Sequence, residues 1–277
     1  MLVTGGSGSF GAAFIRHVLN GKLAERVCVY SRGEHRQAEL REQLDDSRIR
    51  WFIGDVRDRD RLRRAMAGCD TVIHAAALKR IEVGAYGPDE MVKTNVLGAM
   101  NVIEAASAEG VENVVALSTD KAWQPISPYG QTKALAESLF LTANKTFHGP
   151  RYAVVRYGNV WNSAGSIVPS WAAMASRGQT TVPVTDPTCT RFFMLMNEAV
   201  NLVLDAVGKE SIIIPEWLPA YQVRDLATAM GVSMSITGLP WWEKRHEGMR
   251  DDLTSDKARR MTVEELSVRL EEVGYRR

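Results

Sequence analysis

Short apolar segments alternate with longer amphipathic segments through the first 160 residues of this chain. The short segments are nearly continuous in apolar residues and predict strands at residues 1–3, 27–30, 49–53, 71–73, 114–117 and 152–155. The longer segments predict helices near residues 10–20, 34–44, 58–67, 88–109 and 128–147. Uniformly apolar strands separated by helices are typical of a parallel sheet that is covered on both faces. The pattern therefore predicts an α/β fold with a doubly wound parallel sheet.

The regular alternation ends near residue 160, where prolines become frequent and the predicted elements become shorter. Further helices are predicted at 197–207, at 222–230 and after Thr262, which forms a capping box with Glu265. We therefore predict two regions. Residues 1–160 form a nucleotide-binding domain, and residues 161–277 form a smaller substrate-binding region that is interleaved with the first.

Composition narrows the class of protein. The 277 residues are 45% hydrophobic and carry a net charge of +1, so no charged field favours nucleic acid or a membrane surface as a partner. No apolar run reaches the ~18 residues of a membrane span, and the glycine-rich turn at residue 5 leads us to expect no signal peptide. The three cysteines are widely spaced and form neither a metal pattern nor a disulfide framework. We expect a cytoplasmic protein without a metal site.

A glycine-rich turn joins the first predicted strand to the first predicted helix. Its pattern, Gly6-x-Gly8-x-x-Gly11, is the dinucleotide fingerprint, whose glycines form the turn, admit the pyrophosphate to the backbone and let helix and strand pack closely. The start of the helix then offers N–H groups to the phosphates. We therefore expect a Rossmann-type cofactor site that includes Gly5, Gly6, Ser7, Gly8, Ser9, Phe10 and Gly11.

The residues after the second strand choose between NAD and NADP. An NAD site usually has a carboxylate there, which would repel a 2′-phosphate, whereas this chain has Ser31 and Arg32. We therefore predict NADP as the cofactor. Two more strand ends complete the predicted cofactor site, with Asp55 and Val56 after the third strand and Ala75, Ala76, Ala77 and Lys79 after the fourth. Asp55 fits an adenine contact and equally a turn residue.

Reactive side chains gather after the fifth strand, namely Thr119, Asp120, Lys121, Tyr129 and Lys133. Tyr129 and Lys133 are four residues apart at the start of a predicted helix and project from one face. A free phenol with a pKa near ~10 is a weak base at neutral pH, but a nearby ammonium and a positive nicotinamide lower that pKa. The pair can then remove a hydroxyl proton while hydride leaves the same carbon, and Thr119 can hold that hydroxyl.

The chain resembles a known family in many ordered motifs. It is similar to the inverting UDP-N-acetylglucosamine 4,6-dehydratases, within the extended short-chain dehydrogenase/reductase family, over roughly residues 2–250. The motifs are TGGSGSFG, YSR, FIGDVRD, HAAALK, KTNVLGAMNVIEAA, STDKA, PYGQTK, VVRYGNV, GSIVP and TRFFM. The resemblance implies a nucleotide-sugar substrate and self-association into a homo-oligomer.

 The partners implied by the resemblance are a UDP-linked nucleotide sugar and further copies of this chain. It implies no nucleic-acid partner.

The resemblance also implies the roles of the reactive residues. Tyr129 takes the C4 hydroxyl proton while hydride passes to NADP, Lys121 removes the C5 proton next to the new ketone, and Asp120 protonates the departing C6 hydroxyl. The hydride then returns to C6 and C5 is reprotonated. Relatives that retain the C5 configuration have Thr-Asp-Glu where this chain has Thr119-Asp120-Lys121, so inversion is implied. Burial near other cations is expected to lower the pKa of Lys121, and burial to raise that of Asp120.

Further binding residues are implied by the same resemblance. Asn95 is similar to a structural asparagine near the active-site tyrosine, in the cofactor region, and Asn159 to a ligand of the nucleotide phosphates. Arg191 is similar to a phosphate-binding arginine, which suits its geometry. The remaining implied substrate residues are Lys79 and, in the uridine wall, Ser166, Val168 and Pro169.

One segment departs from the family. Where the family has Arg-Pro-Gly-Glu-Lys-Leu-His-Glu, this chain has LPWWEKRHE, from Leu239 to Glu247. The arginine has become Leu239, and the adjacent Trp241 and Trp242 either stack on a base or sugar or fill a hydrophobic gap. This departure leaves a different nucleotide sugar, or a related nucleotide, open as the substrate in place of UDP-N-acetylglucosamine.

Two other functions stay open at this point. One is a nucleotide-sugar epimerase or 5,6-dehydratase, which shares the ketone intermediate. The other, of a different class, is a non-catalytic NADP-binding regulator, against which the retained Tyr129, Lys133 and Thr119 argue.

Overall fold

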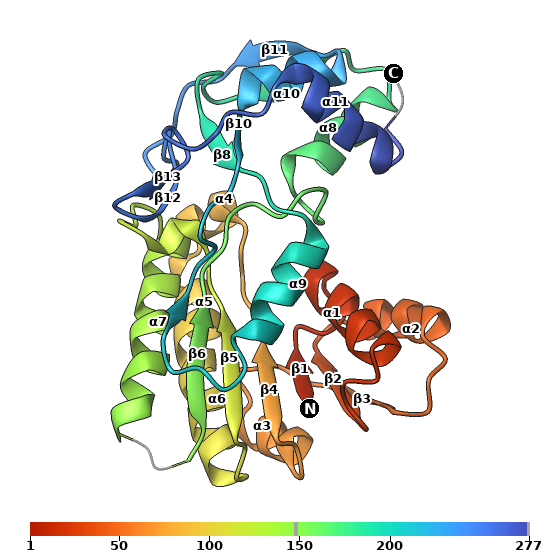
Figure 1. Ribbon diagram of the computed structural model, residues 1–277, viewed down its shortest axis with the longest axis vertical. Coiled ribbons are helices and arrows are strands. Elements are labelled where there is room, and N and C mark those ends of the chain that lie inside the picture. Colours follow the sequence, from red (N-terminus) through yellow and green to blue (C-terminus); the bar gives the residue numbers. More distant parts are fainter. Residues whose placement is uncertain (147–148, 276–277) are drawn as a thin grey trace.

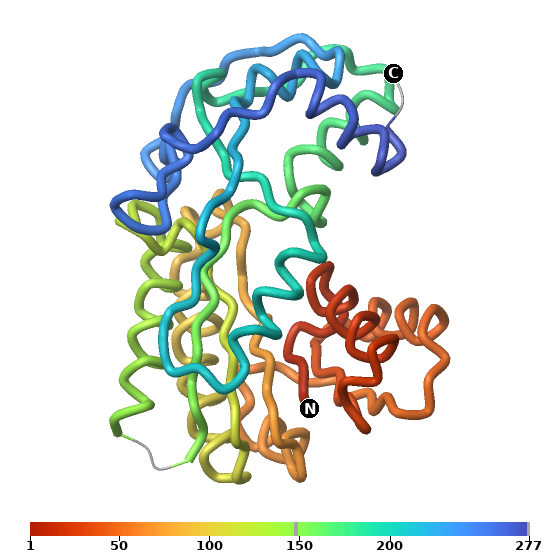
Figure 2. The backbone as a smooth tube through the Cα atoms, in the orientation of Figure 1, coloured from red at the N-terminus to blue at the C-terminus, as the bar shows by residue number. Residues whose placement is uncertain are grey.

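A parallel sheet forms the larger lobe of the protein, shown as a computed structural model in Figures 1 and 2. The structure describes residues 1–146 and 149–275, so residue 147 of the predicted helix 128–147 and residues 276–277 of the predicted second region lie outside it. Within the described residues the sheet has the strand order β3-β2-β1-β4-β5-β6-β9. The strands are Leu2–Thr4 (β1), Val27–Ser31 (β2), Ile49–Ile53 (β3), Thr71–His74 (β4), Asn113–Leu117 (β5), Arg151–Val155 (β6) and Ile212–Ile213 (β9). The order reverses between β1 and β4, where such sheets bind dinucleotides.

Helices cover both faces of the sheet. Neighbouring residues of one strand point to opposite faces, so Leu2 packs in one core cluster and Val3 in another. The first cluster includes side chains of α3 (Arg59–Met66), α6 (Gly98–Ala108) and α7 (Pro128–Thr146), and the second those of α1 (Ser9–Asn20) and α9 (Met196–Asp205). Burial on both faces explains why the central strands are almost entirely apolar, whereas the edge strand β3 carries the exposed Arg50. The predicted doubly wound α/β fold is confirmed.

The predicted helix 88–109 is observed as three consecutive pieces. They are α5 (Pro88–Met91), the π-helical segment η1 (Val92–Leu97) and α6. The short helix α4 (Ile81–Tyr86) precedes them and was not predicted, and α2 (Glu34–Gln43) lies where the sequence placed it. A π-helical segment inside a helix often marks a functional position, and η1 carries Asn95.

A smaller lobe lies at the carboxyl ends of the strands (Figure 1). Its core gathers apolar side chains such as Trp171, Leu226 and Leu266. Its elements are α8 (Ile167–Ala175), β7 (Thr181–Val184), β8 (Thr190–Phe192), β10 (Ala220–Gln222), α10 (Val223–Met230), β11 (Ser233–Ile236), β12 (Gly248–Arg250), β13 (Leu253–Thr254) and α11 (Val263–Glu272). The capping box of Thr262 and Glu265 at the start of α11 is confirmed.

The chain passes between the lobes more than once. After α8, β7 and β8 in the smaller lobe, α9 packs on α1 and β9 pairs with β6 in the large sheet, before β10 returns to the smaller lobe. In the part of the chain that the structure describes, no helix combines the length and apolar character needed to cross a membrane.

Candidate functional site

The turn between β1 and α1 lies at the edge of the sheet that faces the smaller lobe (Figure 1). Gly5 has a φ of +67°, which residues with a side chain rarely adopt. Gly8 is the N-cap of α1 and no side chain caps the helix. The first N–H groups of a helix have no intrahelical acceptor, so this turn suits the phosphates of a dinucleotide.

The end of β2 carries the side chains that distinguish NAD from NADP. The Ser31 hydroxyl accepts hydrogen bonds from Ser7 Oγ and Gln37 Nε2, each at 2.9 Å. The Arg32 guanidinium is half-exposed and lies 3.6 Å from the Asp55 carboxylate, which also binds Arg57 at 2.8 Å. Partial burial alone would raise the pKa of Asp55, but Arg57 and then Arg32 hold it below its ordinary value. The Asp55 carboxylate is therefore already paired with two arginines, Arg32 and Arg57.

The backbone after β4 closes the other side of the turn. The Ala76 N–H donates to Thr4 Oγ1 at 3.2 Å, and Thr4 Oγ1 also bonds His74 Nδ1 at 2.8 Å. Burial, assisted by the charge of Lys133, lowers the pKa of His74 to about 3. His74 is therefore a neutral, packed residue. The predicted Ala75 and Ala77 are half-buried beside it.

Lys79 and Val56, both predicted at the cofactor, have different surroundings. The Lys79 amine donates to the Ala164 carbonyl of the smaller lobe at 2.9 Å. Although Lys79 is exposed as a residue, desolvation around its amine lowers its pKa. Val56 packs in the core below α6 and is 4% exposed, so only its backbone can reach a ligand.

Asn95 fixes the chain that leads into Lys79. Its side chain accepts from the Leu78 N–H at 2.8 Å, donates to the Leu78 carbonyl at 3.0 Å and donates to Thr132 Oγ1 at 3.2 Å. It is 1% exposed. Through these bonds Asn95 links η1, α7 and the loop after β4.

The reactive residues after β5 occupy a single tight turn. Thr119 is the N-cap of the short helix η2 (Asp120–Ala122), and its hydroxyl donates to Asp120 Oδ1 at 3.0 Å. The first turn of α7 packs directly on this turn, and a Cβ on Gly130 would collide with the Lys121 carbonyl. The glycine after Tyr129 therefore allows the start of α7 to pack closely on this turn.

Burial dominates the ionisation of Tyr129 and Lys133. It raises the pKa of Tyr129 to about 12, and the cation that opposes this rise is Lys121. The Lys133 amine instead donates to the Leu117 carbonyl at 2.6 Å, and burial lowers its pKa to about 8. The expectation that Lys133 supplies the ammonium next to Tyr129 thus differs from the structure, because Lys133 points toward the end of β5.

Asp120 and Lys121 form a buried ion pair, with Nζ 3.0 Å from Oδ1. Burial raises the pKa of Asp120, as predicted. Burial alone would lower the pKa of Lys121, but the carboxylates of Asp120 and Glu247 outweigh it and raise the pKa above its ordinary value. The predicted fall in the pKa of Lys121 is therefore wrong, since a carboxylate from the smaller lobe lies 3.3 Å from its amine.

The predicted substrate residues lie across the smaller lobe. Asn159 Oδ1 and Ser166 Oγ are buried and have no hydrogen-bond partner, so each has an unused polar atom. Arg191 on β8 is buried and its guanidinium pairs with the Glu243 carboxylate. Val168 packs in the core of the smaller lobe, and Pro169 beside it is half-buried.

The sequence did not identify Glu247 and Lys244 as parts of this site. Their Oε2 and Nζ atoms lie 3.0 Å apart, and both side chains are largely buried. The signal was present in the segment that departs from the family, where Glu243, Lys244 and Glu247 keep the family's charged positions.

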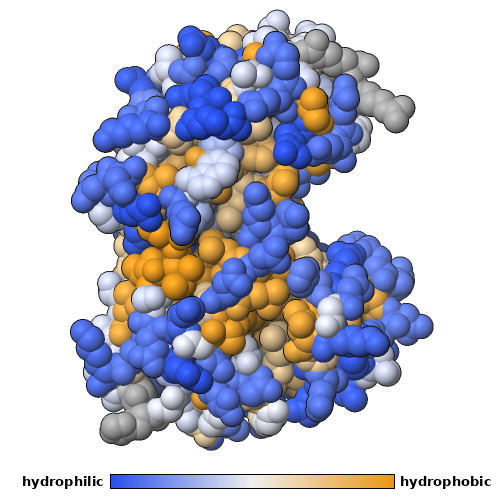
Figure 3. All heavy atoms as spheres, in the orientation of Figure 1, coloured by the Kyte–Doolittle hydropathy of each residue, from blue (hydrophilic) through white to orange (hydrophobic). Residues whose placement is uncertain are grey.

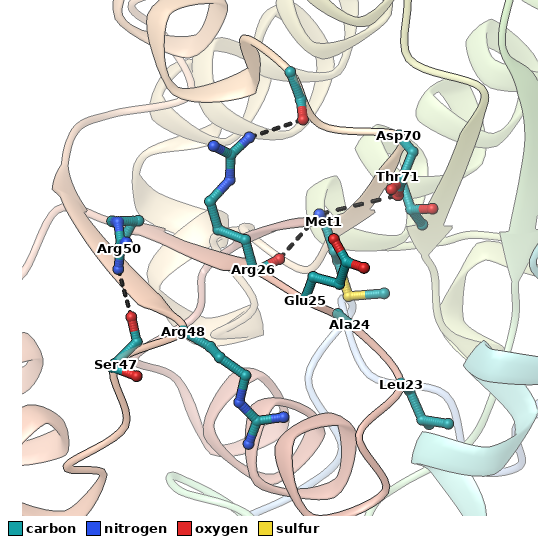
Figure 4. Close-up of a pocket in the computed structure, with 11 residues that line it drawn as sticks. Met1, Leu23, Ala24, Glu25, Arg26, Ser47, Arg48, Arg50, Asp70 and Thr71 are labelled. Carbon is teal, nitrogen blue, oxygen red and sulfur yellow. Dashed lines mark hydrogen bonds and ion pairs between the residues drawn. The ribbon is translucent and has the colours of Figure 1, made fainter.

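Two concave surfaces differ in their relation to this site. The surface is hollowed between the lobes on the right of Figure 3. A hollow of about 460 Å³ is lined by Ile81 of α4 and by Trp242 and Glu243 of the segment before β12, among others. A larger hollow of about 680 Å³ lies at the opposite, amino-terminal edge of the sheet, beside Arg26 and Arg50 (Figure 4). None of the candidate residues lines the larger hollow, so it is not part of the candidate site.

Comparisons with known proteins agree with this geometry. The sequence profile described as "Polysaccharide biosynthesis protein" matches residues 1–267. The inverting UDP-N-acetylglucosamine 4,6-dehydratase of Campylobacter jejuni is 41% identical over 256 residues, which are 90% of this chain and 76% of that protein. The UDP-glucose 4-epimerase of Rickettsia prowazekii is 38% identical over 83% of this chain and 69% of its own length. The X-ray structure of Pen from Bacillus thuringiensis is 31% identical, with a TM-score of 0.92 over 98% of this chain and 97% of that chain.

Proposed function

Because the chain belongs to the polysaccharide biosynthesis protein family, within the extended short-chain dehydrogenases/reductases, we propose that it is an NADP-dependent nucleotide-sugar 4,6-dehydratase that inverts C5, with UDP-N-acetylglucosamine as substrate. Its relatives are nucleotide-sugar dehydratases and epimerases. The observation that carries the dehydratase proposal is the buried Asp120–Lys121 pair beside Thr119 and Tyr129. Dehydration needs an acid and a base beyond those that oxidise the C4 hydroxyl, and this pair supplies both.

The choice of NADP rests on the end of β2. The glycine turn and the uncapped start of α1 fit a dinucleotide pyrophosphate. Ser31 occupies the position where a carboxylate would repel a 2′-phosphate, and the half-exposed Arg32 lies next to it. When bound, the nicotinamide supplies the internal redox chemistry, taking hydride from C4 and returning it to C6.

The side chains of the protein carry out the proton transfers. Tyr129 accepts the C4 hydroxyl proton, with Thr119 holding the hydroxyl, and Lys133 anchors the start of α7 through the Leu117 carbonyl. Lys121 removes the C5 proton as a neutral amine, and Asp120 protonates the C6 hydroxyl as a neutral acid. That working state differs from the resting ion pair only by one proton moved across the 3.0 Å between Nζ and Oδ1.

Two unused polar atoms support a polar ligand in the smaller lobe. Buried polar atoms normally have a partner, so Asn159 Oδ1 and Ser166 Oγ suit hydrogen bonds from a nucleotide. The Arg191 guanidinium suits a diphosphate, and in this structure it pairs with the Glu243 carboxylate. The three thiols are free and buried, which fits the cytoplasm we propose as its location.

Turnover of UDP-N-acetylglucosamine in D₂O tests the function. We expect a product lighter by one water, with inverted C5 configuration and one deuterium at C5, while the hydrogen reaching C6 is protium from C4. A product of unchanged mass with altered ring couplings would instead support an epimerase, the activity named for the Rickettsia relatives. No turnover of any nucleotide sugar, with NADP still bound, would support a non-catalytic regulator.

A further inference from the structure

Glu247 is a buried carboxylate that contacts the candidate base from the other lobe. It immediately precedes β12 and is 2% exposed. Its Oε1 lies 3.3 Å from the Lys121 amine, and its Oε2 lies 3.0 Å from the Lys244 amine. A buried carboxylate is costly unless it is paired. Lys121, then Arg191 and Lys244, lower the pKa of Glu247 against the effect of burial, which accounts for its ionised state.

The backbone around Glu247 is fixed independently of these lysines. The Glu247 N–H donates to Ser255 Oγ at 2.9 Å, and the Ser255 N–H donates to the Glu247 carbonyl at 2.8 Å. Arg156, which directly follows β6, donates to the Met249 carbonyl at 2.6 Å. The hairpin of β12 and β13, and with it the backbone of Glu247, is thus held through hydrogen bonds that do not involve Lys121.

Lys121 lies between two carboxylates, with Asp120 at 3.0 Å and Glu247 at 3.3 Å. When Asp120 carries a proton to act as an acid, it no longer balances the ammonium, whereas Glu247 still does. The charged or ionisable groups that face this position are Asp120, Tyr129, Arg191, Tyr221 and Glu247, with Lys244 behind Glu247.

We propose that Glu247 is a positioning residue of the dehydration step, which holds the Lys121 side chain in place and is the counterion of the ammonium that forms there. The inference rests on the proposed dehydratase function. In that step the C5–H bond breaks, its proton joins Nζ of Lys121, and the electron pair stays on the substrate. The Asp120 O–H bond also breaks, and its proton leaves with the C6 hydroxyl as water. Glu247 itself makes and breaks no bond.

The substitution Glu247→Gln tests this role in the purified protein with NADP. We expect loss of water to slow by about tenfold or more, because the amine is less well held, while reduction of NADP by the substrate persists. Removing the carboxylate also favours the neutral amine. The rising limb of the pH profile for water loss should therefore move to lower pH by about one unit. A purely structural role would lower the rate without moving that limb.

Two other variants of the same loop serve as controls. Glu243→Gln removes a carboxylate that pairs with Arg191 and not with Lys121, so it should leave the limb in place. Lys244→Met removes the cation behind Glu247, so the limb should move the opposite way, to higher pH. Lys244→Met also keeps the test decisive if Glu247→Gln does not fold.

Competitive labelling of lysines with acetic anhydride gives a readout that needs no turnover. Only the neutral amine reacts, so Lys121 should label faster in Glu247→Gln and more slowly in Lys244→Met, relative to the exposed Lys145 in the same sample. Unchanged Lys121 labelling in both variants overturns the role of Glu247, even if the protein is a dehydratase. Changed labelling without turnover of nucleotide sugars keeps the Lys121–Glu247 coupling and overturns the proposed function instead.

Discussion

The guanidinium of Arg156, which directly follows β6, and the carboxylate of Glu137 on α7 form a buried ion pair beside the candidate site, with Nε 3.0 Å from Oε1. The Ser118 hydroxyl, next to Thr119, donates to the same carboxylate. Arg156 also holds the β12 hairpin through the Met249 carbonyl. This pair therefore joins the helix of Tyr129, the strand before Thr119 and the hairpin of Glu247.

Removing one partner of this pair should be strongly destabilising. Glu137→Ala leaves the Arg156 charge buried without its carboxylate, which typically costs about 3–5 kcal/mol. The matched control is Glu109→Ala, whose exposed pair with Arg63 should contribute less than about 1 kcal/mol. Denaturant unfolding measures both losses. Equal losses of unfolding free energy in the two variants would show that the buried pair stabilises the fold no more than the exposed pair does.

His74 should make the protein less stable as the pH falls. Its folded-state pKa of about 3 lies below the unfolded value near ~6.5. Its contribution is therefore fully present above the unfolded pKa and is lost as the pH falls toward the folded one. His74→Phe should lose less thermal stability than wild type between about pH 7 and about pH 5. His17→Phe, at an exposed position, should behave like wild type, and an unchanged pH dependence in His74→Phe would contradict the assignment.

Lys121→Met should separate oxidation from loss of water. The variant keeps Tyr129, so the substrate should still reduce NADP, but without the base the C5 proton remains and reduced cofactor accumulates. Tyr129→Phe is the contrast, since it should bind NADP and lose about 10²–10⁴ in the rate of oxidation itself. Stopped-flow absorbance of reduced nicotinamide distinguishes the two. Loss of water by Lys121→Met at the wild-type rate is incompatible with Lys121 as the base.

Arg32→Asp should erase the preference for NADP. The change replaces attraction by repulsion at the 2′-phosphate, and loss of a charged hydrogen bond corresponds to at least about tenfold in affinity. The control Arg41→Asp changes an exposed arginine in the last turn of α2 and should have little effect. Calorimetric titration with NADP and NAD gives the affinities, and tighter binding of NAD by the wild type would contradict the cofactor assignment.

The order of strands and helices could be predicted because periodicity is a local property. The strand predicted at 49–53 is observed as Ile49–Ile53, and the helix predicted at 222–230 as Val223–Met230. The π-helical segment Val92–Leu97 could not be predicted, because it lies within one continuous helical pattern. Its Asn95 bonds Leu78 and Thr132, which only the folded chain brings near.

The family resemblance read from the ordered motifs is confirmed by the profile match over residues 1–267. The sequence by itself determined which reactive groups are close along the chain, such as Asp120 with Lys121 and Tyr129 with Lys133, because turns and helices fix short separations. Only the tertiary structure decided the ionisation of Lys121. Electrostatic energy depends on distance through space, and folding brings Glu247 from the smaller lobe to within 3.3 Å of that amine.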